Sequence, residues 1–356
     1  MIKFIQKTLV IFLVLIFLAV NVSAEGTEII VTFGGDCTLG SEDKYWEKES
    51  SFIQYIEKYG FEYPFVNLKP IFESDDITMV NLEGVFHDSK RGKLKKTYNF
   101  RAPSTYAQIL PLASIEAVTL GNNHSMDYDR HGFEATTTAL DNFGVEWYVN
   151  CRYTNKGYLY QKNGAKIGFV GVYIGDWRRQ PSLVRGTIDE LKSKGAKAIV
   201  GIIHGGTEYS LRHDSNQEKM ADWLIKEGVS VVIGHHPHVV QGVNIKGSTS
   251  IVYSLGNLSF GGNDKIKEHA GDALLARTSF YFDAVGNYTG HRIWLIPIHP
   301  SSAGGLVNNY QPILANAEEA NRILAVVQND TPFTLSPYVL GEGCALPFVP
   351  AAGTIN

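Results

Sequence analysis

The chain has 356 residues, of which 44% are hydrophobic and 19% are charged, and its formal net charge is -4. This is the composition of a globular protein that is long enough to bury a sizeable core. The slightly acidic balance argues against a nucleic-acid-binding protein, because that function requires clustered Lys and Arg on one surface.

The N-terminal segment predicts export from the cytoplasm. Lys3 and Lys7 precede an apolar run from Leu9 to Val20, and the small residues Ser23-Ala24 follow. A short basic region, an apolar run and a small-residue end are the parts of a secretory signal peptide. The alternative is an uncleaved membrane anchor, for which the run is short, since a span takes roughly 20 residues. With residues 1–24 as leader or anchor, both predict an extracytoplasmic protein, whether secreted, periplasmic or associated with the cell envelope.

A repeated pattern follows this segment: a short apolar stretch runs into a polar, glycine-rich loop. Apolar stretches that end in turn-forming residues are typical of strands. The pattern predicts strands at Glu28–Phe33, Asp76–Val80, Ala117–Leu120, Ala198–Ile203, Val229–Ile233 and Ser250–Leu255.

Helical periodicity lies between these strands and again near the C-terminus. Strands that alternate with helices predict an α/β domain. We expect this domain to span residues 25–300, with the strands Leu274–Phe282 and Arg292–Ile298 completing its second sheet. Residues 301–356 predict a C-terminal helix and an irregular tail packed on the same domain. The predicted helices are Thr105–Leu112, Gly132–Phe143, Ser215–Glu227 and Ala315–Val327.

Candidate metal ligands follow the ends of the predicted strands. Asp36, Glu83 and His204 come after three separate strands, and His236-Pro237-His238 presents two imidazoles in one loop. Ligands of α/β sheets bind beyond the carboxyl ends of the strands, so we expect these residues to meet at one rim. Each residue alone also fits an ordinary turn or cap, and the prediction therefore depends on their convergence.

The segment Asn122-Asn123-His124 adds a further ligand and a candidate acid. An Asn side-chain oxygen can ligate a metal ion, and His124 would then point into the site without binding it. Asp127, three residues later, would hold the imidazole in one orientation. Alternatively, Asp127 or Asp129 caps the following helix and His124 is an ordinary loop residue. Six ligands at one rim suit two divalent ions (Mn, Fe, Zn or Mg) that share a carboxylate.

Taken in order, these motifs resemble those of the CapA-type family of poly-γ-glutamate capsule biosynthesis proteins. That family belongs to the calcineurin-like metallophosphatase superfamily, and the resemblance runs from about residue 28 to residue 260. It implies a four-layer α/β/β/α sandwich with the metal site at its rim. The matching segments are Gly34-Gly35-Asp36, Asn81-Leu82-Glu83, Asn122–Asp127, His204–Tyr209, Gly234–Gln241 and Tyr253–Asn257.

The resemblance also implies a role for each site residue. Asp36 would bind the first metal, and Glu83 would bridge the two metals. Asn123 and His204 would bind the second metal, and His236 and His238 would each bind one of the two ions. His124 would act as the general acid with the help of Asp127. The expected substrate contacts are Arg101, Glu208 and His235.

The chain departs from the superfamily pattern in its first motif. Many superfamily members have Asp-x-His where this chain has Asp36-Cys37-Thr38, so one imidazole is absent. Glu83 stands in place of an Asp, and Gly205 stands where the family often has an aromatic residue. These departures predict that the first metal is weakly held or absent.

The resemblance implies an exported, metal-dependent, phosphoesterase-like hydrolase that acts in capsule or cell-envelope polymer biosynthesis. Two alternatives stay open: an accessory protein that binds an anionic glutamyl polymer without turnover, and a hydrolase of a γ-glutamyl amide bond. The expected partners are an anionic small-molecule or polymer substrate and membrane-bound capsule synthesis proteins. The three cysteines are too few for a disulfide framework, and a Cys151–Cys344 pair stays open.

Overall fold

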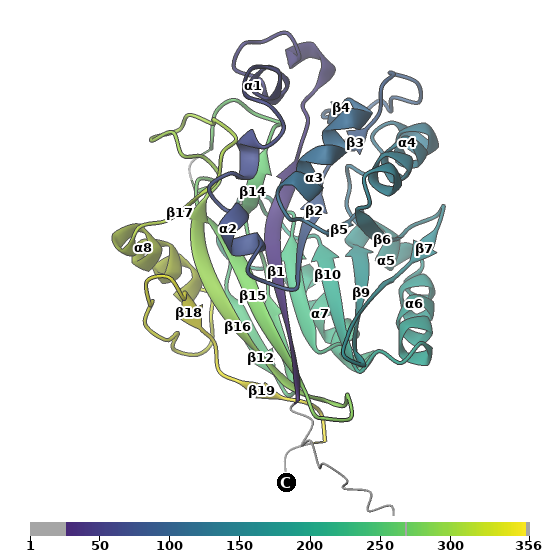
Figure 1. Ribbon diagram of the computed structural model, residues 1–356, viewed down its shortest axis with the longest axis vertical. Coiled ribbons are helices and arrows are strands. Elements are labelled where there is room, and N and C mark those ends of the chain that lie inside the picture. The colour runs from purple at the N-terminus through teal and green to yellow at the C-terminus, as the bar shows by residue number, and fades with distance from the viewer. Residues whose placement is uncertain (1–25, 268, 354–356) are drawn as a thin grey trace, which may run out of the picture.

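The computed structural model describes residues 26–267 and 269–353, so the predicted leader lies outside the described residues. Two β-sheets form the centre, and helices lie on both sides of them (Figure 1). The larger sheet runs in the order β17 (Ile313–Leu314), β16 (Tyr288–His299), β15 (Ala273–Phe282), β1 (Thr27–Thr38), β2 (Ile77–Leu82), β5 (Ala117–Thr119), β6 (Glu146–Asn150) and β7 (Asn155–Lys156).

Short strands extend this larger sheet. β14 (Asn257–Phe260) pairs with β1, and both β18 (Cys344–Ala345) and β19 (Val349–Pro350) pair with β16. The smaller sheet has the order β12 (Val243–Lys246), β13 (Thr249–Val252), β11 (Val231–His235), β10 (Ala198–His204), β9 (Ala165–Tyr173) and β8 (Tyr158–Lys162). A separate pair joins β3 (Val85–Phe86) to β4 (Arg101–Ala102).

The helices fall between and around these strands. The α-helices are α1 (Phe52–Tyr59), α2 (Lys69–Phe72), α3 (Ile109–Leu112), α4 (Asp129–Asn142), α5 (Ile174–Arg179), α6 (Pro181–Ser193), α7 (Ser215–Lys226) and α8 (Ala317–Gln328). The 3₁₀ helices are Asp43–Tyr45, Tyr63–Phe65 and Ser104–Gln108. Within the described ranges, no helix combines the length and the hydrophobicity that a membrane crossing needs.

Three hydrophobic layers hold these elements together. The central layer lies between the sheets, where Phe33 of β1 and Phe169 of β9 are both fully buried. A second layer joins the larger sheet to α1, α3 and α4, and a third joins the smaller sheet to α6 and α7. The fold is therefore the expected α/β/β/α sandwich, and the predicted fold class is confirmed.

The central strands of both sheets are parallel, which sets where a site can form. β1, β2, β5 and β6 are parallel in the larger sheet, and β9, β10, β11 and β13 are parallel in the smaller one. Their carboxyl ends carry the polar loops that the sequence singles out, so these loops gather along one rim.

The structure corrects several predicted elements. β15 and β16 extend the larger sheet instead of completing the second one, because β15 pairs antiparallel with β1 along Thr27–Phe33. The predicted strand at Ser250–Leu255 stops at Val252. Much of the predicted helix at Thr105–Leu112 is a 3₁₀ helix. The three cysteines are buried and free, so Cys151 and Cys344 do not pair.

β1 also runs past its predicted end, through Gly34-Gly35-Asp36 to Thr38. The reason is β14, which lies parallel to β1 with Asp36 opposite Asn257. A Cβ on Gly35 would lie 2.1 Å from the carbonyl oxygen of Gly256, so only glycine permits this approach. The Asp36 amide donates a hydrogen bond to the same carbonyl at 2.9 Å, which fixes the pairing.

The C-terminal region is tied to the smaller sheet through Asp330. Its carboxylate accepts hydrogen bonds from the His213 amide at 3.0 Å and the Gly242 amide at 2.9 Å. The His213 ring, with Nδ1 2.9 Å from the same carboxylate, stacks on Tyr253 at a centroid distance of 3.7 Å. Burial lowers the pKa of His213, but the hydrogen bond and charge of Asp330 raise it further, so the net shift is upward. The pKa of Asp330 is raised by burial but lowered more by these hydrogen bonds.

We predict that Gly35→Ala lowers the free energy of unfolding by about 3 kcal/mol, because the new methyl group overlaps backbone that cannot move aside. Gly186→Ala is the matched control, since Gly186 lies in α6 with nothing within 4 Å of its added Cβ. The control should raise stability by about 0.5–1 kcal/mol. Denaturant unfolding of the two variants measures both effects, and equal stabilities would contradict the assigned contact.

We predict that Asp330→Asn lowers the free energy of unfolding by about 1–2 kcal/mol near pH 5.5. Asp330 contributes above its ordinary pKa of 3.8, and charged His213 contributes below its ordinary pKa of 6.5. The effect should therefore shrink as the pH falls through the lowered pKa of Asp330 or rises through the raised pKa of His213. Asp189→Asn, at an exposed aspartate of α6, is the control. A difference in unfolding free energy between Asp330→Asn and the unaltered chain that does not change with pH would refute the contribution of the Asp330–His213 pair.

Candidate metal centre

The predicted ligands come from strand ends that lie far apart in sequence. Asp36 belongs to β1, Glu83 follows β2, His204 ends β10, and the loop after β11 carries the remaining imidazoles. Distances of 4 Å or less link these side chains to one another. The predicted residues that the structure brings together are Asp36, Glu83, Asn123, His124, Asp127, His204, His235, His236 and His238.

One group of donors surrounds His204. Its Nε2 lies 2.7 Å from Oδ1 of Asn123 and 3.1 Å from Nδ1 of His236. The same Nε2 is 3.8 Å from Oε1 of Glu83. These are the donors that the family resemblance assigns to the second metal.

A second group surrounds Nδ1 of His238. This nitrogen lies 3.2 Å from Oδ2 of Asp36 and 4.0 Å from Oε2 of Glu83. Oδ2 of Asp36 also accepts a hydrogen bond from the His236 amide at 3.1 Å. This bond links the histidine loop, residues 236–238, to β1. Glu83 thus faces one group with each of its two oxygens.

The Glu83 carboxylate tests whether a cation fits here. The side chain is fully buried, and neither of its oxygens has a hydrogen-bond partner. A buried ionised carboxylate without partners is costly unless a positive charge compensates it. Donor atoms of Glu83, His236 and His238 all lie within 4.8 Å of one another, so both imidazoles lie close to the carboxylate that cations would share. The residues therefore fit a divalent cation.

Burial and mutual charge shift the pKa values of Glu83, His238 and His204. Burial raises the pKa of Glu83, and the nearby carboxylates of Asp36 and Asp127 add to the rise. Burial lowers the pKa of His238, but the charges of Glu83 and Asp36 raise it more. Burial, and then the charge of His236, lowers the pKa of His204, which favours the neutral imidazole whose lone pair can bind a metal.

A buried pair of side-chain amides, Asn81 and Asn122, supports these ligands, and neither residue has a role predicted from the sequence. Nδ2 of Asn81 lies 2.8 Å from Oδ1 of Asp36 and 3.1 Å from Nδ1 of His204, so one amide spans two predicted ligands. Asn122 donates to Oδ1 of Asn81 at 2.9 Å. Its own oxygen accepts the His124 amide at 2.9 Å, which shapes the turn that carries His124. Such supporting hydrogen bonds orient ligands and tune a metal site.

His124 is held as a positioned acid would be. Its Nδ1 lies 2.7 Å from Oδ2 of Asp127, and its Nε2 lies 3.9 Å from Oε1 of Glu83. Asp127 also accepts the Phe100 amide at 2.7 Å and pairs with Lys96. Asp127 does not cap α4, because the residue at the N-cap is Tyr128, which makes no side-chain cap hydrogen bond.

The three predicted substrate contacts lie in different surroundings. Arg101 is buried, pairs with Asp43 at 2.8 Å and stacks on Trp46, so its charge is already compensated. His235 is also buried, with Nδ1 3.6 Å from Oδ1 of Asp36. Glu208 is exposed and raises the pKa of Glu83 through its charge. A substrate contact by any of them stays a prediction.

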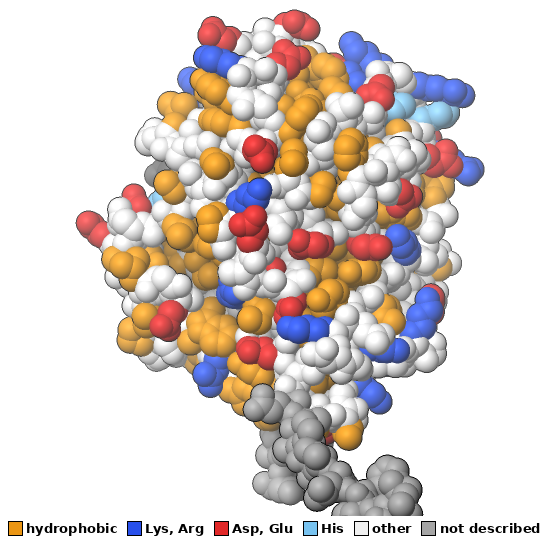
Figure 2. Space-filling view, in the orientation of Figure 1, with side chains coloured by type: hydrophobic (Ala, Val, Ile, Leu, Met, Phe, Trp, Pro, Cys, Tyr) orange, Lys and Arg blue, Asp and Glu red, His pale blue; other side chains and the backbone are white. Residues whose placement is uncertain are grey.

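A basic loop between β3 and β4 borders the site. Five of the seven residues from 90 to 96 are Lys or Arg. Lys96 reaches the site directly, since its ammonium group donates to the Asn123 carbonyl at 2.8 Å. Lys93 pairs with Asp43 at 2.9 Å. In Figure 2, blue side chains gather at the upper right, where Figure 1 places this loop. Sequence reasoning missed this run of basic residues, and only the fold shows that it lies beside the site.

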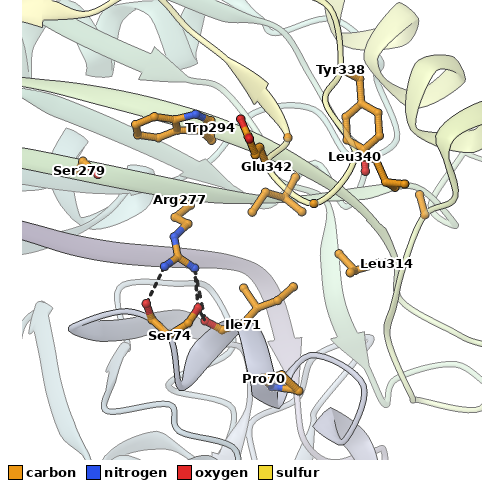
Figure 3. A pocket seen from close by; sticks show the side chains of 14 residues that line it. Pro70, Ile71, Ser74, Arg277, Ser279, Trp294, Leu314, Tyr338, Leu340 and Glu342 are labelled. Carbon is orange, nitrogen blue, oxygen red and sulfur yellow. Dashed lines mark hydrogen bonds between the residues drawn. The ribbon is translucent and has the colours of Figure 1, made fainter.

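A separate cleft of about 660 Å³ lies on the outer face of β15 and β16, beside α2. In Figure 3, Arg277 points toward Ile71 and Ser74, and Trp294 and Tyr338 line the opposite part. The Arg277 guanidinium group donates hydrogen bonds to Ser74 and to the carbonyl oxygen of Ile71. The residues that line this cleft include none of the predicted ligands, so this cleft is not the candidate metal site.

The chain has recognisable relatives. The family model described as bacterial capsule synthesis protein PGA_cap matches residues 30–262. The capsule biosynthesis protein CapA of Bacillus anthracis is 26% identical over 259 residues, which cover 66% of this chain and 61% of that protein. The PGA biosynthesis protein CapA of Bacillus subtilis is 28% identical over 249 residues, which cover 64% of this chain and 62% of that protein.

In both cases the match spans less than two thirds of the relative's own length. Among solved structures, purple acid phosphatase PPD1 from yellow lupin seeds aligns with a TM-score of 0.32 and 12% identity. The alignment covers 87% of this chain and 57% of that one.

We predict that Glu83→Gln raises the free energy of unfolding of the metal-free protein by about 1–3 kcal/mol near pH 7, because it removes a buried carboxyl group whose raised pKa makes its ionisation in the folded chain unfavourable. The same change should abolish stabilisation by Mn²⁺, which for the unaltered chain is about 2.7 kcal/mol at an ion concentration of 100 Kd. Thermal unfolding with and without Mn²⁺ measures both. Glu134→Gln, at an exposed ion pair on α4, is the control. A Glu83→Gln variant that Mn²⁺ still stabilises would contradict the assignment.

Proposed function

The chain belongs to the family of bacterial capsule synthesis proteins described as PGA_cap, and on this premise we propose that it is a metal-dependent, phosphoesterase-like hydrolase that acts outside the cytoplasm in capsule or envelope polymer synthesis. The observation that carries the proposal is the buried, unpartnered Glu83 carboxylate between two groups of nitrogen and oxygen donors. Its two oxygens suit a carboxylate shared by two divalent ions.

The donor groups assign residues to each ion. Asn123, His204 and His236 would hold one ion, Asp36 and His238 the other, and Glu83 both. Divalent ions held there would supply Lewis acidity, which activates water and neutralises charge on a phosphoryl group. The lowered pKa of His204 favours this use, because a protonated imidazole has no lone pair for a metal, whereas His238, whose pKa is raised, would release its proton when a metal binds.

His124 is the proposed general acid. Its Nδ1 is engaged by Asp127, which leaves Nε2 facing Glu83 and the site. A proton on Nε2 is then placed to pass to a leaving-group oxygen. Asp127 is fixed in turn by the Phe100 amide and by Lys96, so the imidazole keeps one orientation.

The proposed substrate is an anionic small molecule or polymer, and the basic loop from 90 to 96 supports this class. Lys93 and Lys96 are paired with Asp43 and Asp127. The exposed side chains of Lys90, Arg91 and Lys95 suit an anion that approaches the metal centre from this side. Membrane-bound capsule synthesis proteins are the proposed partners. The basic and apolar N-terminal segment supports export, and the relatives' names support the capsule role.

A non-catalytic role in binding an anionic glutamyl polymer is the second candidate. Thr38 favours it, because this residue stands where many superfamily members place an imidazole ligand. Hydrolysis of a γ-glutamyl amide is a third, since water activated between two metals can also attack a carbonyl carbon. Product analysis separates the third from phosphoester hydrolysis.

The direct experiment measures hydrolysis of phosphate mono- and diesters by residues 25–356 with added Mn²⁺. We expect turnover by the unaltered chain and none by His236→Ala, which loses a metal ligand. A folded, metal-loaded chain without turnover would contradict the hydrolase and favour polymer binding or amide hydrolysis.

We predict that His124→Ala lowers kcat by about 10²–10⁴-fold while bound metal stays unchanged, because His124 gives a proton and does not ligate. His131→Ala is the matched control, since His131 is an exposed histidine on α4 and should leave both quantities unchanged. Activity assays paired with metal analysis test this. Full activity of His124→Ala would refute the acid assignment.

A further inference from the structure

We propose that Asn257 is a ligand of the first metal and takes the place of the imidazole that the Asp36-Cys37-Thr38 segment lacks. This inference rests on the metal centre of the proposed function. It adds a residue to that centre and changes the kind of ion that the first site should prefer.

The backbone places Asn257 beside Asp36. β14 pairs parallel with β1, and the two residues are direct partners in the register. Partners on neighbouring strands present their side chains on the same face of the sheet. The close contact of Gly35 with the Gly256 carbonyl, one residue before each partner, holds this register in place.

The side chain of Asn257 is directed at the first site. Its Oδ1 lies 3.0 Å from Nδ1 of His238, and its Nδ2 donates to the His238 carbonyl at 3.4 Å. Asn257 is only 5% exposed. The same Nδ1 of His238 is 3.2 Å from Asp36 and 4.0 Å from Glu83. Three oxygens from three separate segments therefore surround one imidazole nitrogen, as donors around an ion do.

Thr38 does not supply the missing donor. It lies two residues after Asp36 on β1, so it shares the face of that carboxylate. Its hydroxyl is buried and has no hydrogen-bond partner, and it offers neither a charge nor an amide oxygen. An Asn carbonyl oxygen, by contrast, is an established ligand for hard divalent cations.

With Asn257 included, both sites have four protein donors. The second site would have Asn123, His204, His236 and Glu83. The first would have Asn257, His238, Asp36 and Glu83, which is three oxygens and one nitrogen. Oxygen-rich donor sets favour Mn²⁺ or Mg²⁺, whereas added imidazole favours Zn²⁺. The first site should therefore select a harder ion than the second.

The test measures Mn²⁺ bound to the full chain by titration calorimetry and elemental analysis. We expect two ions per unaltered chain and two for Asn257→Asp, which keeps an oxygen donor at the same place. Asn257→Ala should bind the first ion more than about 100-fold more weakly and keep the second. Exposed Asn321 on α8 provides the control, and Asn321→Ala should bind two ions as the unaltered chain does.

A smaller loss in Asn257→Ala would overturn the ligand assignment, because residues that only orient a ligand change metal affinity by about 10–100-fold. Equal losses in Asn257→Ala and Asn257→Asp would overturn it too. An unaltered chain that binds no ion would overturn both this inference and the proposed metal centre. Two ions bound without hydrolysis would refute the enzyme and support the ligand assignment if Asn257→Ala loses one.

Discussion

Two carboxylates, Asp36 and Glu83, are completely buried at the same rim, and the structure around them is organised to tolerate this. Burial of like charges is strongly unfavourable unless positive charge or hydrogen bonds compensate it. Asp36 receives amide hydrogen bonds from Asn81 and His236, but Glu83 receives none. The remaining compensation comes from imidazoles that arrive from the other sheet. The same arrangement that makes the metal-free rim costly also makes its residues fit a divalent cation.

Precise strand geometry makes that convergence possible. Parallel strands in both sheets bring their carboxyl ends to one rim, and the glycine contact between β1 and β14 brings a further strand against Asp36. The histidine loop carries strain as well: His236 and His238 have φ angles of 97° and 59°, in the left-handed region that non-glycine residues seldom adopt. Strain of this kind persists only where the surrounding structure enforces it, and it often accompanies function. Three hydrophobic layers supply that support.

Much of this could be predicted from the sequence, because each ligand follows an apolar strand and parallel strands share a rim. What the sequence could not show depends on tertiary pairing. β15 belongs to the larger sheet because it pairs with β1, and no local sequence pattern encodes this pairing. Arg101 looked available for an anion, but Asp43 already compensates its charge. Asn257 lay inside a recognised motif, yet its place beside His238 becomes visible only once β14 is paired. Sequence reasoning predicts no element between β6 and α6, although β9 there is a nine-residue, almost wholly buried strand.

The central claim is that this rim binds two divalent ions with Glu83 between them. The most direct measurement is a crystal structure of the Mn²⁺-loaded protein with anomalous scattering recorded at the manganese edge. The account predicts two peaks about 3.5–4 Å apart. One should lie against Asn123, His204 and His236, and the other against Asp36, His238 and Asn257. A single peak, or none at this rim, would contradict the account.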